Sequence, residues 1–219
     1  MTRPRIALVG RFTTSASALR YAGVVSSRAL LESVWAAGGD PVTFLPVASS
    51  DWHQRLAGVH GVLLAGGGDI DPARYGQDPD PSVYDVDAVQ DDADFGIAAA
   101  ALELELPMLA VCRGLHVLNV LRGGTLVQDM PVNHRHHVHQ VDYLGTSLTC
   151  SCYHHQAVDR VGQGLTVLAR ATDGAVEALG VDGSPQVTAV QWHPEDTAGN
   201  DPAQAALFAQ LIEQARARS

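Results

Sequence analysis

The 219-residue sequence contains no lysine. Its positive charge comes from 14 arginines, which face 24 aspartates and glutamates and leave a formal net charge of −10. Without lysine, Schiff-base catalysis is excluded. The acidic balance argues against nucleic acid or an anionic membrane surface as the main partner.

Long apolar runs and a set of paired cysteines are also missing. No stretch approaches the roughly eighteen apolar residues of a membrane span, and the run that begins at Ile6 is too short for a signal peptide, so we expect a cytoplasmic protein. The three cysteines, Cys112, Cys150 and Cys152, are odd in number, and the last two stand too close for an ordinary disulfide framework. We expect reduced thiols.

The hydrophobic content of 46% suits one well-buried α/β domain over residues 1–219, with no linker-like tract to divide it. In the first half, strand-like and helix-like segments alternate: strands are predicted at 6–9, 41–47, 61–65 and 107–111, and helices at 25–37 and 86–106. This alternation predicts a largely parallel sheet with helices on both faces. Ligands of such sheets bind beyond the carboxyl ends of the strands.

The second half has a different pattern. Residues 123–145 are polar and rich in histidine, and a helix is predicted at 202–218. Short strand-like runs between them, at 147–150, 165–171, 175–179 and 187–192, predict antiparallel additions to the same sheet.

Cys112 stands where the apolar run 107–111 gives way to a helical pattern. An isolated cysteine after a hydrophobic strand is more often a buried core residue. Here the start of a helix would stabilise a thiolate, and Arg113 could add positive charge. The position is therefore typical of a nucleophile on a sharp strand-to-helix turn.

His193 and Glu195 end the strand-like run about eighty residues later. Two residues apart in extended chain, their side chains project to the same side. A cysteine nucleophile needs a base, and the base needs a group that fixes its tautomer. The order Cys112, His193, Glu195 supplies a complete catalytic triad.

Five segments together resemble one family. They are residues 63–76 with the glycines 66–68, the Cys112-Arg113-Gly114 turn, and residues 153–157, 173–178 and 191–195. In register, they resemble the class I glutamine amidotransferase superfamily and, within it, the peptidase C26 branch that includes γ-glutamyl-γ-aminobutyrate hydrolase. The resemblance spans about residues 5 to 212. It implies an α/β, flavodoxin-like three-layer sandwich with a mainly parallel central sheet.

The resemblance also implies residue roles. Cys112 would attack the substrate carbonyl, His193 would act as the general base and Glu195 would orient it. The backbone N–H groups of Gly67 and Arg113 would form the oxyanion hole. The remaining implied substrate-binding residues are Gly66, Gly68, His116, Tyr153, His154, His155 and Gln156. Two positions depart from the family pattern: His116 replaces the usual glutamine, and Cys152 replaces a serine.

The histidine-rich segment 133–140, with His154, His155 and two nearby cysteines, also suggests zinc, but no fixed ligand spacing across two elements is apparent. We expect no metal and no organic cofactor. The resemblance implies hydrolysis of a γ-glutamyl amide through a γ-glutamyl thioester, with a small-molecule substrate. Whether the chain forms a homodimer stays open. The alternative is a glutaminase subunit that delivers ammonia to a partner synthase. A non-catalytic binding protein is a third interpretation, and the identity of the amine half of the substrate stays open.

Overall fold

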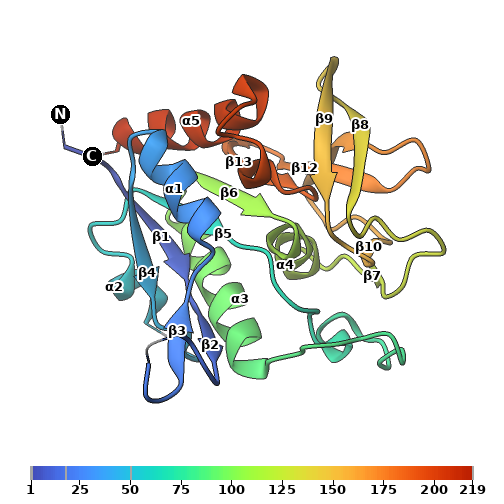
Figure 1. The fold of residues 1–219 in the computed structure, drawn as a ribbon, viewed down its shortest axis with the longest axis horizontal. Helices are drawn as coiled ribbons and strands as arrows, with labels where there is room; N and C mark the ends of the chain where they lie inside the picture. Colours follow the sequence, from blue (N-terminus) through green and yellow to red (C-terminus); the bar gives the residue numbers. More distant parts are fainter. Residues whose placement is uncertain (1, 18, 50, 219) are drawn as a thin grey trace.

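The computed structural model describes residues 2–17, 19–49 and 51–218 (Figure 1). Its centre is a seven-stranded sheet whose strands, in spatial order, are β11 (Leu165–Arg170), β12 (Val176–Val181), β13 (Ser184–Val190), β6 (Met108–Val111), β5 (Gly61–Leu64), β1 (Arg5–Val9) and β4 (Asp40–Phe44). The five strands from β13 to β4 are parallel, while β11 and β12 pair antiparallel at one side. The prediction of a mainly parallel sheet with antiparallel additions is confirmed.

Helices cover both faces of this sheet, as the three-layer prediction requires. One face carries α1 (Arg28–Ala36) and α5 (Pro202–Arg216), and the other carries α2 (Trp52–Arg55), α3 (Ala88–Glu103) and α4 (Arg113–Leu121) (Figure 1). Side chains alternate between the faces along each strand. In β1, Ile6 and Leu8 pack in the core under α1 and α5, whereas Ala7 and Val9 belong to the core under the other helices.

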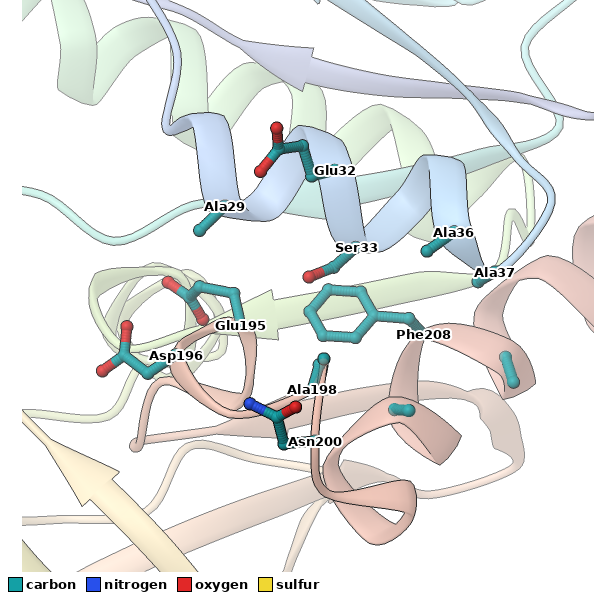
Figure 2. Close-up of a pocket in the computed structure, with 13 residues that line it drawn as sticks. Ala29, Glu32, Ser33, Ala36, Ala37, Glu195, Asp196, Ala198, Asn200 and Phe208 are labelled. Carbon is teal, nitrogen blue, oxygen red and sulfur yellow. The ribbon is translucent and has the colours of Figure 1, made fainter.

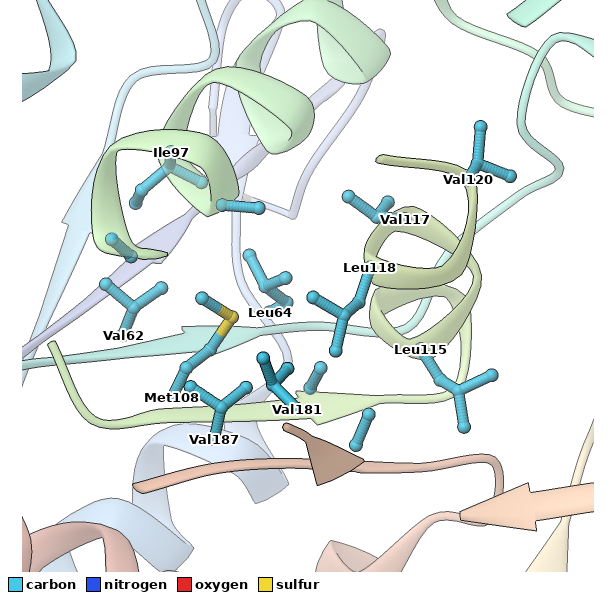
Figure 3. Close-up of a cluster of buried hydrophobic side chains, with 14 of the residues drawn as sticks. Val62, Leu64, Ile97, Met108, Leu115, Val117, Leu118, Val120, Val181 and Val187 are labelled. Carbon is cyan, nitrogen blue, oxygen red and sulfur yellow. The ribbon is translucent and has the colours of Figure 1, made fainter. Parts of the chain in front are cut away.

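The core between the sheet and the second helix layer lies beside the start of α4. Val62 and Leu64 of β5 and Met108 of β6 meet Ile97 of α3 and Leu115 of α4, and all are at most 2% exposed (Figure 3). A fully buried side chain of this size contributes about 1.5–3 kcal/mol. The first turn of α4 therefore stands on a rigid platform.

A hairpin of β8 (His137–Tyr143) and β9 (Thr146–Cys152) forms a sheet of its own beside the central one (Figure 1). The prediction that residues 147–150 extend the central sheet is wrong. Leu144 and Gly145 both have positive φ, as the two central residues of a tight hairpin turn do, so β9 pairs with the local strand β8 instead. The polar, histidine-rich sequence of β8 concealed that strand.

The other predicted elements differ mainly at their ends. The helix predicted from residue 25 begins at Arg28, because Val25 belongs to β3 (Gly23–Val25), which pairs with β2 (Arg11–Thr13). The helix predicted over 86–106 begins after Asp87, whose carboxylate caps it by accepting from two backbone N–H groups. Short remaining elements are η1 (Pro72–Tyr75), η2 (Pro194–Asp196) and the paired strands β7 (Leu126–Val127) and β10 (Ala157–Val158).

All three cysteines are free thiols, in agreement with the expectation from the sequence. None of the helices in the described part of the chain is long and apolar enough to cross a bilayer.

Candidate active site

Cys112 lies at the junction of β6 and α4 with φ 51° and ψ −107°, a backbone conformation that non-glycine residues rarely adopt. Such strain persists only where the surroundings hold it in place, and it is found at functional sites. Here the Cys112 N–H donates to the Val190 carbonyl at 2.8 Å. A Cβ on Gly114 would lie 2.7 Å from Leu64 Cβ, so only glycine lets α4 start this close to β5.

His193 and Glu195 follow β13 and lie beside Cys112. The His193 Nδ1 and Glu195 Oε1 atoms are 2.8 Å apart, and the backbone N–H of His193 donates to the Ser151 carbonyl at 2.8 Å. Because a carboxylate only accepts, Nδ1 carries the proton and the ring is held in one tautomer. A Cβ on Gly66 would lie 3.8 Å from His193 Nε2 and 3.6 Å from Cys112 Cβ, so the two side chains flank one point.

The electrostatics of His193 reflect these neighbours. Burial by itself lowers the pKa of His193, but the Cys112 sulfur and the Glu195 carboxylate outweigh it and raise this pKa well above its usual range. A protonated imidazole next to the sulfur favours a thiolate. Within the described residues, the buried Nε2 atom has no hydrogen bond of ordinary geometry, which leaves it available to a reacting group.

Two backbone N–H groups near Cys112 have no acceptor in the described part of the chain. Arg113 is the first residue of α4, where an N–H has no partner within the helix. The N–H of Gly67 likewise takes part in none of the hydrogen bonds found among residues 2–17, 19–49 and 51–218. Both residues line the pocket above Cys112, as an oxyanion hole requires.

The Arg113 side chain points away from the thiol. Its guanidinium is buried and bound to the carboxylates of Asp91 and Asp94 on α3. Two carboxylates balance its charge, so the expectation that Arg113 adds positive charge to Cys112 is wrong. The residue instead fastens the start of α4 to α3.

A small pocket collects most of the implied substrate-binding residues. It is lined by Gly67, Gly68, Asp69, Tyr84, Cys112, Arg113, His116, Tyr153, His154, His155 and Gln156. Gly66 lies beside the pocket, against His193. The Gln156 side-chain nitrogen is buried without a partner among the described residues, so it is a ready donor for a bound ligand.

His116, in the first turns of α4, is buried next to Cys112. Its Nε2 lies 2.7 Å from Gln191 Oε1, and the amide nitrogen of Gln191 lies 3.9 Å from the Cys112 sulfur. Burial lowers the pKa of His116 to about 3, so the ring is neutral. An uncharged His116 therefore donates to Gln191 and keeps Nδ1 as an acceptor.

The two histidines that follow Tyr153 use their ring nitrogens within the protein. His155 contacts the carboxylates of Asp69 and Asp129 at 3.1–3.2 Å. His154 Nδ1 lies 2.8 Å from the Gln156 carbonyl. Both rings thus shape the pocket wall, whereas the Tyr153 side chain is 47% exposed at its rim.

A second group of reactive residues lies behind the pocket wall and consists of His134, Cys152, His154 and Glu177. The sequence pattern pointed to three of these residues, because the histidine-rich segment 133–140, His154 and the nearby cysteines suggested zinc. It did not connect them with Glu177, which lies in the family-like segment 173–178 that had no obvious task. The group contains the residue types of a cysteine triad. However, burial and the Glu177 carboxylate raise the pKa of the Cys152 thiol far above its usual range, which disfavours a nucleophilic thiolate.

Another pocket lies on the far side of Glu195, between α1 and α5 (Figure 2). Glu195, Asp196 and Phe208 line it together with small residues of α1. The second carboxylate oxygen of Glu195 is buried and has no partner among the described residues. Its first oxygen alone therefore orients His193.

Comparison with known proteins identifies the family of this chain. The family model for peptidase C26 matches residues 6–195. A Mycobacterium tuberculosis protein described as a candidate glutamine amidotransferase is 39% identical over 185 residues, which cover 75% of this chain and 60% of that protein. The γ-glutamyl-γ-aminobutyrate hydrolase PuuD of Escherichia coli is 33% identical over 196 residues, which cover 75% of this chain and 76% of the hydrolase.

The fold has a counterpart among solved structures. A crystal structure from Thermoplasma acidophilum, described as that of a candidate GMP synthase subunit, superposes with a TM-score of 0.70 over 100% of this chain and 96% of its own, at 14% identity. This likeness concerns the fold alone. With the family model matched over most of its length, the chain belongs to the peptidase C26 family of class I glutamine amidotransferase-like proteins.

Proposed function

We propose that this protein hydrolyses γ-glutamyl amides, with Cys112 as nucleophile, His193 as general base and acid, and Glu195 as the residue that orients His193. One observation carries the proposal. Cys112 is held in a strained conformation at a helix start, beside a histidine whose other nitrogen is bound to the Glu195 carboxylate, a side chain that is only 5% exposed. Membership of the peptidase C26 family and similarity to a γ-glutamyl-γ-aminobutyrate hydrolase support the substrate class.

In the first half of the reaction, the Cys112 sulfur, whose proton is held by His193, attacks the γ-carbonyl carbon as a thiolate. The N–H groups of Gly67 and Arg113 donate to the oxyanion that forms. His193 then gives the proton to the departing amine as the C–N bond breaks. The product on the enzyme is a γ-glutamyl thioester.

In the second half, His193 takes a proton from water, which attacks the thioester carbonyl. The carbon–sulfur bond breaks, glutamate leaves and the Cys112 sulfur is restored. Gln156, with its unpartnered side-chain N–H₂ group in the pocket, is placed to donate to a carboxylate of the glutamyl half.

The test compares two buried cysteines with different neighbours: Cys112 lies beside His193, and Cys152 lies beside the Glu177 carboxylate. Glutamate release from a panel of γ-glutamyl amides is measured for the wild type, Cys112→Ala and Cys152→Ser. We expect Cys112→Ala to lose on the order of 10⁴- to 10⁶-fold in kcat, because nucleophile and base act as a unit. Cys152→Ser should lose far less activity than Cys112→Ala, because the nucleophile and the base both remain.

A glutamine-like electrophile followed by intact-mass analysis then locates the reactive thiol. Labelling of Cys112 supports the proposal. Labelling of Cys152, or loss of turnover only when Cys152 is replaced, would overturn it. A wild-type protein that prefers free glutamine, and only with a synthase present, would instead identify a glutaminase subunit.

A further inference from the structure

Four side chains of different chemical types converge behind the pocket wall; we refer to them as the buried cluster. They are His134, Cys152, His154 and Glu177, and their nearest ligand atoms all lie within 4.8 Å of one another. They come from three places in the fold: the loop before β8, the end of β9 with the loop that follows, and β12. Each of the four residues is at most 4% exposed.

The spacing of these atoms is that of ligands around one metal ion. His134 Nδ1 lies 3.2 Å from His154 Nε2 and 3.3 Å from Glu177 Oε1. His154 Nε2 lies 3.7 Å from the same Oε1, and the Cys152 sulfur lies 3.8 Å from Oε2. Tetrahedral zinc, with bonds of about 2.0–2.3 Å, separates neighbouring ligand atoms by roughly 3.3–3.6 Å.

The outer nitrogen of each histidine in the cluster is already bound. His134 Nε2 lies 2.9 Å from Asp173 Oδ2, and His154 Nδ1 lies 2.8 Å from the Gln156 carbonyl. Because carboxylate and carbonyl oxygens only accept, these outer nitrogens carry the protons. In the neutral rings, the inner nitrogens then carry lone pairs. Metal-binding histidines show this same arrangement, with an outer carboxylate or carbonyl that fixes the tautomer.

The consequence is that three acceptors converge at one buried point, with the Cys152 thiol and His139 Nε2 beside them. The inner nitrogens of His134 and His154 and the Glu177 carboxylate face each other at 3.2–3.7 Å, without a proton between them when the rings are neutral. Their mutual repulsion is relieved either by an additional proton or by a cation. A cation that accepts two imidazoles, a thiolate and a carboxylate in tetrahedral geometry is zinc.

We propose that the buried cluster is a structural zinc site, with His134 Nδ1, His154 Nε2, Glu177 and the Cys152 sulfur as its four ligands. On binding, the Cys152 thiol releases its proton to water and forms the sulfur–zinc bond. His139 Nε2, 3.3 Å from that sulfur, donates its N–H to the thiolate. No metal was expected from the sequence because the candidate ligands show no fixed spacing along the chain. A site whose ligands come from separate elements of the fold does not need such a spacing.

The site would fasten the hairpin and the pocket wall to the central sheet. Cys152 ends β9, His154 belongs to the loop that lines the pocket, and Glu177 lies in β12. The backbone N–H of His134 also donates to the His154 carbonyl at 2.9 Å, so two of the ligands are already joined. All four positions of the metal are filled by protein, which is typical of a structural zinc site and not of a catalytic one.

The experiment measures metal content and does not depend on activity. The full chain is loaded with ZnCl₂, desalted and analysed for zinc by mass spectrometry, beside Cys152→Ser, Cys150→Ser and the surface variant His137→Ala. We expect about one zinc per chain in the wild type, in Cys150→Ser and in His137→Ala, and a loss of retained zinc in Cys152→Ser. Circular dichroism shows whether each variant is folded.

Two further measurements separate this site from nonspecific binding by exposed histidines. Loading with CoCl₂ should produce a thiolate-to-cobalt charge-transfer band that Cys112→Ala retains and Cys152→Ser lacks. Asp173→Asn removes the carboxylate that faces His134 Nε2 and keeps an oxygen for the Ala175 N–H, and it should weaken zinc affinity by about 10- to 100-fold. Absence of retained zinc in the wild type, or zinc that is lost with His137 and kept without Cys152, would overturn the proposal.

Discussion

Asp91 should be one of the most costly carboxylates to neutralise, because it is completely buried between two arginines. One oxygen binds the Arg113 guanidinium, and the other accepts from Arg74 Nε and from the Asp71 backbone N–H, each at 3.0 Å. In Asp91→Asn, one amide N–H₂ group would face an arginine donor and the Arg113 charge would lose one of its two partners. Removing one member of a buried ion pair costs about 3–5 kcal/mol.

Asp92 provides the matched control. It is the next residue of α3 and also binds Arg74, at 2.5 Å, but its side chain is 46% exposed. Exposed pairs of this kind contribute about 0–1 kcal/mol. For a chain of this length, about 1 kcal/mol shifts the Tm by roughly 2–4 °C, so Asp91→Asn should lower it by about 6–20 °C and Asp92→Asn by a few degrees at most.

Thermal unfolding followed by circular dichroism, at low and at high salt, tests these predicted Tm shifts. Salt should reduce the small effect of Asp92→Asn and leave that of Asp91→Asn almost unchanged, because buried pairs are poorly screened. Equal Tm values for the two variants would refute the reasoning. So would an Asp91→Asn protein that unfolds within a degree of the wild type.

Further predictions concern the residues around Cys112. Replacing His193 with Ala should cost on the order of 10⁴- to 10⁶-fold in kcat and Glu195→Gln clearly less, and equal losses would contradict the assigned roles. His116→Gln should shift the kcat/KM ratio toward free glutamine by roughly 10- to 100-fold, measured on glutamine and γ-glutamyl amines. Burial lowers the pKa of His116 to about 3, so the unfolded chain binds a proton below about pH 6.5 that the folded chain does not. The wild type should thus lose about 1.4 kcal/mol per pH unit there relative to His116→Gln, as checked by urea unfolding at pH 7 and 5. Gly114→Ala should destabilise the protein by about 1–3 kcal/mol by forcing a Cβ onto Leu64, whereas Gly199→Ala, with open space around it, should not.

The sequence predicted those parts of the fold and site whose signals are local. Strands buried on both sides read as continuous apolar runs, and this pattern located β1, β5 and β6 to within about one residue. The pairing of His193 with Glu195 is equally local, since two residues of extended chain suffice to bring the side chains together. The position of Cys112 at a strand-to-helix junction followed from the change in periodicity alone.

Features that depend on long-range pairing were not visible in the pattern. The partner of β9 is a strand with four exposed residues among its seven positions, so no hydrophobic alternation announced it. Similarly, the sequence places Arg113 next to Cys112 but does not show where its side chain points. That is decided by the buried carboxylates of α3, about twenty residues earlier in the chain. The position of the Arg113 guanidinium is therefore set by the two carboxylates that neutralise its charge.

The buried cluster shows the same limit most clearly, because its members stand in an order that matches no metal-binding motif. His134 and Glu177 are separated by 43 residues, and only the closure of the β8–β9 hairpin against β12 brings them together. The family resemblance seen in the sequence implies a serine at position 152, and a thiol in its place is a zinc ligand of far higher affinity than a hydroxyl. If Cys112 is the nucleophile, as proposed, a metal held by Cys152 would also keep the second thiol from competing for electrophilic substrates. The two cysteines would then perform separate tasks, Cys112 in the pocket as a nucleophile and Cys152 behind the pocket wall as a metal ligand.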